Sequence, residues 1–150
     1  MTESPSPARS DSSSPASDGD AALWQEVLAT EHAVIWCYGL VGSVSDLADE
    51  AERALSAHRA RRSACIAVLV ELGEEPVASA AAYDVNRPAN PDAARRLAAA
   101  LESDATTAYV GLAAAAERRS RLLAAQWLTE SAVAQTQWDG QVPALPGFPD

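Results

Sequence analysis

Two side chains able to do chemistry stand inside apolar stripes of the sequence, where they should face a protein core. Between residues 21 and 42, apolar residues recur at spacings of three and four, which follow one helix face, and Glu31 lies in the middle of them. A second series between residues 46 and 73 has His58 at its centre and Arg62 one turn further along. A buried carboxylate without a partner costs several kcal/mol, so Glu31 requires a cation, a proton or a metal ion.

Three kinds of site would satisfy Glu31, and the sequence leaves them open. We favour a buried cluster in which Glu31, His58 and Arg62 bind one another, since inward polar residues usually satisfy each other. A metal site is the alternative, with Glu31 and His58 as ligands and iron or manganese as candidate metals, neither of them favoured. A cavity for a small ligand is the third. An Arg62 guanidinium bonded to Glu31 would supply the positive charge of a metal, so the first two sites exclude each other.

The elements that must position these residues are helices. The chain has 150 residues, a length typical of one domain, and 48% of them are hydrophobic. Alanine is very common, while Phe and Ile are scarce, which favours helix over sheet. We therefore predict an all-α protein with one folded unit at residues 20–139.

Caps and periodicity predict four helices. The first runs from about Ala21, capped by Asp20, to about Gly42, and the second opens after Ser45 and closes at Gly73. The third begins at Asn90-Pro91-Asp92, an N-cap followed by proline at the first helical position. A turn near Glu117 starts the fourth, which runs to Trp138 or Asp139.

The segments outside these helices differ from them in composition or in length. Residues 1–19 are mostly Ser, Pro and Asp, so we predict a disordered tail there. Residues 140–150 are rich in proline and should form an irregular tail that Leu145 and Phe148 pin to the bundle. The connection from Glu74 to Ala89 is much longer than a hairpin turn and could cross the whole bundle. The pattern is a hairpin, a long crossover and a second hairpin, which is the connectivity of ferritin-like four-helix bundles.

The first hairpin sets the heights of its residues. A turn near residues 43–45 places residues whose numbers sum to about 88 or 89 at the same level, so Glu31 faces His58. The same rule puts Cys37 and Cys65 about 20 Å apart along the bundle, too far for a disulfide. His32 should face outward or toward the crossover.

The second hairpin offers weaker candidates at this level. Asp104 and Glu130 are the only acids there near the inner face, and each lies at the edge of its apolar stripe. They are the remaining candidate metal ligands. The arginines Arg59, Arg61 and Arg62, together with Arg53, are expected to form a solvated face or a bridge to acids of the first helix.

Charge limits the partners. The formal net charge is -10, and an acidic surface repels nucleic acid and anionic lipid. No stretch has the apolar length of a membrane span and no signal peptide is recognisable, so a cytoplasmic location is expected. The apolar outer side of the first helix, around Trp36, should be covered by the crossover or by the second subunit of a homodimer.

Several motifs together carry a resemblance to a known family. These are TEHAVIWCYG at residues 30–39, HRARRS at 58–63, AAAYDV at 80–85, WLTESAVAQTQW at 127–138 and the closing PGFP. From about Ala21 to Pro149 the sequence resembles an uncharacterised ferritin-like family, a domain of unknown function, of GC-rich Gram-positive bacteria. The resemblance implies the ferritin-like bundle and no established activity. It would assign the helix 1 ligand role to Glu31 and the helix 2 imidazole role to His58.

Together these features favour a metal-free bundle with a buried Glu-His-Arg cluster that acts as a binding or structural module or as a dimer. The alternative is a degenerate ferritin-like oxidoreductase that holds one redox metal. A full dinuclear site needs Glu-x-x-His on two helices. Leu55 stands where the second helix would need Glu, and the fourth helix has no His.

Overall fold

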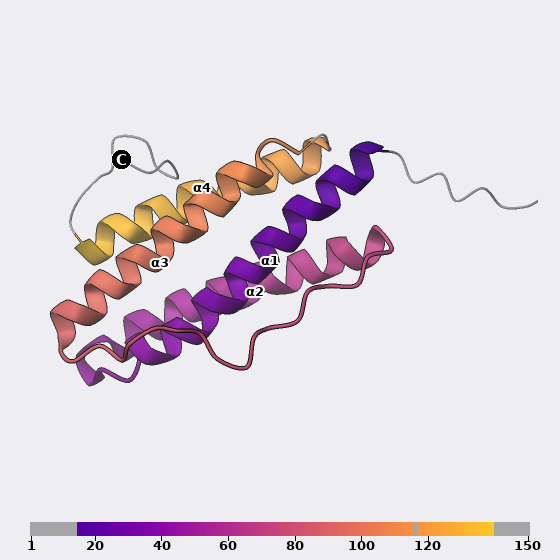
Figure 1. The fold of residues 1–150 in the computed structure, drawn as a ribbon. Coiled ribbons are helices and arrows are strands. Elements are labelled where there is room, and N and C mark those ends of the chain that lie inside the picture. Colours follow the sequence, from indigo (N-terminus) through magenta and orange to yellow (C-terminus); the bar gives the residue numbers. More distant parts are fainter. Residues whose placement is uncertain (1–14, 116, 140–150) are drawn as a thin grey trace, which may run out of the picture.

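The computed structural model describes residues 15–115 and 117–139, and these ranges hold only helices and their connections (Figure 1). The α-helices are α1 (Pro15–Val41), α2 (Ala48–Glu71), α3 (Pro91–Leu112) and α4 (Arg118–Asp139), and a short 3-10 helix, η1 (Ser45–Leu47), precedes α2. The prediction of an all-α four-helix bundle is confirmed. The predicted tails at residues 1–14 and 140–150, with Leu145 and Phe148, lie outside the described residues.

Most helix ends lie where the sequence places them. Asn90 caps α3, its side chain accepting a hydrogen bond from the Ala93 N–H at 2.8 Å. Gly73 follows α2 with a φ of 80°, a conformation that glycine adopts without strain. Glu117 precedes α4, and its carboxylate accepts a hydrogen bond from the Ser120 N–H at 2.7 Å. The predicted turn near Glu117 is therefore confirmed.

The start of α1 was predicted wrongly. The helix begins at Pro15 and not near Ala21, so residues 15–19, expected in the tail, are helical. Proline fits the first turn of a helix, where the backbone N–H has no partner to lose. Asp20 consequently lies inside α1, and its carboxylate accepts from the Glu117 N–H at 2.9 Å instead of capping its own helix. It ties α1 to the start of α4.

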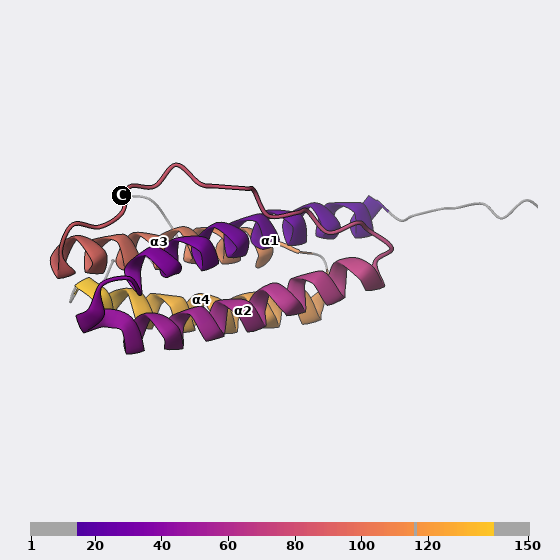
Figure 2. The same ribbon diagram turned by 90° about the horizontal axis from the view of Figure 1, so that it is seen from below.

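The four helices form two layers (Figure 2). α1 and α3 lie in one layer and α2 and α4 in the other, with antiparallel hairpins α1–α2 and α3–α4 (Figures 1 and 2). The connection from α2 to α3 runs back along the outside of the α1–α3 layer, so α2 and α3 point the same way. The face formed by α2 and α4 is on the opposite side from this crossover (Figure 2).

The crossover docks on the outer side of α1. The backbone N–H of Val77 donates to the Gln25 side chain at 2.8 Å, and its carbonyl lies 3.1 Å from His32 Nε2. Tyr83 contacts Trp36 with ring centroids 5.7 Å apart. The predictions that His32 faces the crossover and that the crossover covers Trp36 are confirmed, while a homodimer stays a prediction.

The core has two apolar clusters with a polar layer between them. One contains Cys37, and its larger members include Tyr38, Val41, Leu47, Leu55 and Trp138. The other contains Cys65, and its larger members include Trp24, Leu28, Leu69, Leu112 and Trp127. The two thiols are free and lie in different clusters, as the hairpin geometry predicts. No helix among the described residues combines the length and the apolar character of a membrane span.

Candidate functional site

A buried histidine lies between two buried carboxylates at the middle of the bundle. His58 Nδ1 is 2.8 Å from Glu31 Oε2, and His58 Nε2 is 3.2 Å from Glu102 Oε1. The exposed fractions of the three side chains are 2% or less. α1, α2 and α3 each contribute one residue, so the layer ties three helices together. The predicted pairing of Glu31 with His58 is present in this geometry.

Each carboxylate also accepts a hydrogen bond from a buried tyrosine. Tyr38 donates to Glu102 Oε1 at 2.6 Å, and Tyr109 donates to Glu31 Oε1. Burial and the adjacent carboxylate charges raise the pKa of both phenols, so they stay protonated and act as donors. Each glutamate therefore has a neutral hydroxyl donor in addition to its contact with His58.

His58 is held as a cation. Burial alone would lower its pKa, but the hydrogen bonds and charges of Glu102 and Glu31 outweigh burial and raise the pKa to about 9. An imidazole whose two nitrogens both contact carboxylates must donate from both, which only the protonated ring can do. Burial likewise acts to raise the pKa of Glu102, but the His58 contact and the Tyr38 hydroxyl lower it. The three side chains therefore form an imidazolium, that of His58, between the carboxylates of Glu31 and Glu102.

Arg61 extends this network to α4. Its side chain is 7% exposed, and one terminal nitrogen donates to Tyr109 Oη at 3.1 Å and to Ser131 Oγ at 2.8 Å. The other terminal nitrogen donates to Glu130 Oε2 at 2.9 Å. The guanidinium thus links α2, α3 and α4 through a single side chain.

Three of the predicted site residues need correction. Arg62 is only half-buried and makes none of the contacts of the cluster; Arg61, expected on a solvated face, takes that role. The two positions differ by about 100° around the helix, and the acceptors on α3 and α4 lie on the Arg61 side. Asp104 is exposed and lies outside the network. Glu130 is largely exposed and binds Arg61, not His58.

The site residues that the sequence analysis did not identify lie on the second hairpin, and the sequence does contain a signal for one of them, Glu102. Glu102, Tyr109 and Ser131 are buried, and Glu102 follows Ala98 by four and precedes Ala105 by three, which is the spacing of a helix face. The spacing of the buried alanines in α3 therefore identifies the helix face that carries Glu102.

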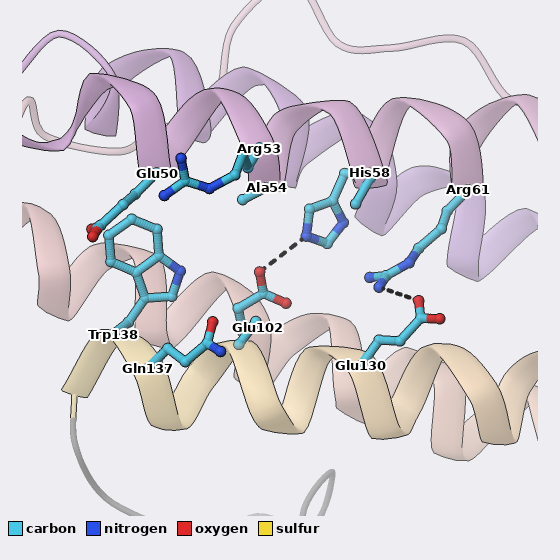
Figure 3. Close-up of a pocket in the computed structure, with 11 residues that line it drawn as sticks. Glu50, Arg53, Ala54, His58, Arg61, Glu102, Glu130, Gln137 and Trp138 are labelled. Carbon is cyan, nitrogen blue, oxygen red and sulfur yellow. Dashed lines mark hydrogen bonds and ion pairs between the residues drawn. The ribbon is translucent and has the colours of Figure 1, made fainter.

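An open cleft reaches this network from the surface between α2 and α4 (Figure 3). It encloses about 520 Å³. His58, Arg61 and Glu102 line its inner part, and Ala57, Ala134 and Trp138 are among the residues of its walls. In Figure 3 the Glu102 carboxylate points into the space between the two helices. The cleft therefore extends inward as far as the ionic layer.

One atom at the floor of this cleft lacks a partner. Glu102 Oε2 is buried and has no hydrogen bond to any described residue. The Ser131 hydroxyl is near enough to help lower the pKa of Glu102, but it does not have hydrogen-bond geometry toward Oε2. Buried polar atoms are satisfied in the great majority of cases, so this oxygen is a candidate acceptor for a donor from outside the protein.

The residues present do not fit a ferritin-like metal centre. Both His58 nitrogens are occupied by carboxylates, so the imidazole has no lone pair to offer. Arg61 brings a fixed positive charge to the Tyr109 hydroxyl, which also binds Glu31. Among the described residues there is no group of three His, Cys, Asp or Glu side chains that could hold a metal ion. In this network the positive charges beside the carboxylates are those of His58 and Arg61.

Comparisons with known proteins give a family but no activity. The crystal structure of a conserved hypothetical protein from Mycobacterium tuberculosis is similar, with 32% sequence identity and a TM-score of 0.78 over 85% of this chain and 98% of that chain. No curated protein matches. A family model described as a domain of unknown function, DUF4439, matches residues 23–150. The chain therefore belongs to the DUF4439 family.

Proposed function

We propose that the protein is a small-molecule binding module, built on a ferritin-like frame, whose binding site is the cleft between α2 and α4. The observation that carries the proposal is the buried, unpartnered Glu102 Oε2 at the floor of that cleft. A buried carboxylate oxygen without a donor, in a residue that lines an open cleft, can accept a hydrogen bond from a bound ligand.

The cleft has the other properties of a ligand site. Its volume of about 520 Å³ falls within the range of small-molecule pockets. A histidine with a strongly raised pKa lies in it, and such groups gather at functional sites. The crossover lies on the other side of the bundle and does not obstruct entry (Figure 2).

Two features support the ferritin-like frame. The helices follow the order hairpin, long crossover, hairpin, which is the connectivity of that class. The polar layer also lies at the centre of the bundle, on inward positions of facing helices, where bundle proteins build their sites. In this chain that layer holds the imidazolium of His58 and the guanidinium of Arg61.

A fragment screen with one blocking variant tests the proposal. We would record ligand-observed NMR of a mixed set of amine, alcohol and acid fragments with the full chain. Ala57 and Ala60 are both exposed on α2, but only Ala57 lines the cleft. We expect binding signals that Ala57→Trp abolishes and Ala60→Trp keeps. If no fragment binds, or if both variants bind alike, the cleft is not a ligand site.

A further inference from the structure

The unpartnered atom of Glu102 determines which ligand groups could bind next to it. This atom, Oε2, is a carboxylate oxygen, which can only accept while Glu102 is ionised. The other oxygen of that group already accepts from Tyr38 and His58. A ligand group at this point must therefore carry N–H or O–H.

The charge of the network favours a positively charged donor. Three carboxylates, those of Glu31, Glu102 and Glu130, contact two cations, His58 and Arg61. Of these five residues only Glu31 does not line the cleft, and it lies behind His58. One negative charge is left over. At the mouth of the cleft Glu50 and Arg53 cancel each other, so the excess is not neutralised there. A ligand that brings one positive charge would balance the site.

The walls suit an apolar body attached to that cation. The indole of Trp138 lies at one end of the cleft in Figure 3, and Ala54, Ala57 and Ala134 are also among the residues that line it. An indole face attracts organic cations and packs against flat rings. A bare inorganic cation would leave these walls without contact.

From these three features we infer that the cleft binds a small organic cation, a protonated amine on an aromatic or aliphatic body, with the ammonium group donating to Glu102 Oε2. This inference rests on the proposed function and narrows it to one ligand class.

Three probes of nearly equal shape separate the ligand classes. Phenethylamine carries a protonated amine, phenethyl alcohol a neutral donor and hydrocinnamate an anion, all on the same ring. Titrated into the full chain and followed by amide chemical shifts, the amine should bind about tenfold more tightly than the alcohol, since a charged donor makes the stronger hydrogen bond. The anion should not bind measurably.

Variants place the amine at Glu102. Glu102→Gln should weaken phenethylamine binding about tenfold or more. Asp104→Asn, an exposed acid on the same helix outside the cleft, is its matched control and should leave Kd unchanged. Circular dichroism and urea unfolding would show whether the Glu102 variant is folded.

Variants of two exposed residues at the mouth of the cleft test the charge of the ligand without disturbing the buried core. Glu50→Gln should weaken amine binding about twofold to threefold, and Arg53→Gln should strengthen it by a similar factor, since each changes one charge near the entrance. Opposite shifts in these two variants support the inference even if Glu102→Gln fails to fold.

The outcomes distinguish the two levels of the proposal. If the alcohol or the anion binds as tightly as the amine and Ala57→Trp abolishes that binding, the cleft is a ligand site but its ligand is not a cation. If other fragments bind in the cleft and none of the amines does, the inference is equally wrong. If nothing binds at all, the proposed function fails with it.

Discussion

Raising the pH from about 6.5 to about 8.5 should lower the free energy of unfolding by about 2 kcal/mol, because His58 is protonated only in the folded state over this range. The folded pKa of about 9 lies above the ordinary value of 6.5, so the folded protein holds the proton more tightly than the unfolded chain. The stabilisation is fully present below about pH 6.5 and is lost as the pH rises through about 9.

The magnitude follows from the distance between the two pKa values. The whole gap between 6.5 and about 9 corresponds to about 3 kcal/mol. About 2 kcal/mol of it disappears by about pH 8.5, where the unfolded imidazole is neutral and the folded one is still mostly charged. At higher pH the buried thiols of Cys37 and Cys65, whose pKa burial raises, add a loss of the same sign. The measurement should therefore stop near pH 8.5.

Urea unfolding followed by far-UV circular dichroism at several pH values in this window measures the effect. The chain has two histidines, so the control is clear: His32→Gln should keep the pH dependence and His58→Gln should remove most of it. Titration of the two imidazoles by NMR should give the higher pKa to His58. The reasoning is refuted if wild type and His58→Gln show the same slope, or if His58 titrates at or below its ordinary pKa.

Three further predictions concern the arginine, a helix cap and metal content. Arg61→Met should lower the free energy of unfolding by about 2–4 kcal/mol, while Arg62→Met should change it by less than about 0.5 kcal/mol, and equal losses in urea unfolding would contradict the assignment of Arg61. Glu117→Ala should lower the midpoint of urea unfolding through loss of the α4 cap, relative to the exposed control Glu74→Ala, and no difference between the two variants would argue against that cap. Protein expressed with added iron, manganese and zinc and then dialysed should show no stoichiometric metal by elemental mass spectrometry; stoichiometric metal that is lost in Glu31→Ala would overturn the metal-free reading.

The first hairpin could be predicted well because local rules define it. A tight turn fixes which residues of α1 and α2 share a level, and the helical period fixes which face is inward. These two rules were enough to predict that Glu31 faces His58. In the structure Glu31 Oε2 lies 2.8 Å from His58 Nδ1. The caps of α3 and α4 follow from equally local chemistry at Asn90 and Glu117.

The rest of the site depends on contacts that no local rule contains. Arg61 and Arg62 follow His58 by three and by four residues, and both spacings suit an inward side chain. Only the position of Tyr109 and Ser131 on the other hairpin decides that Arg61 is the buried one. Glu102 was missed because alanines on both sides of α3 make its inner face difficult to recognise from hydrophobicity alone. The cleft itself follows from the spacing of α2 and α4, which the sequence does not express.

The buried charges are divided unequally between the two hairpins, and this division bears on how the hairpins recognise each other during folding. The α1–α2 hairpin contributes both cations, His58 and Arg61, and one anion, whereas the α3–α4 hairpin contributes the anions Glu102 and Glu130. Two hairpins that docked one turn out of step would bury opposite charges beyond each other's reach, at a cost that apolar contacts alone would not impose. The ionic layer thus favours one register of docking between the two hairpins. Two alanine-rich helical surfaces would otherwise pack in several registers.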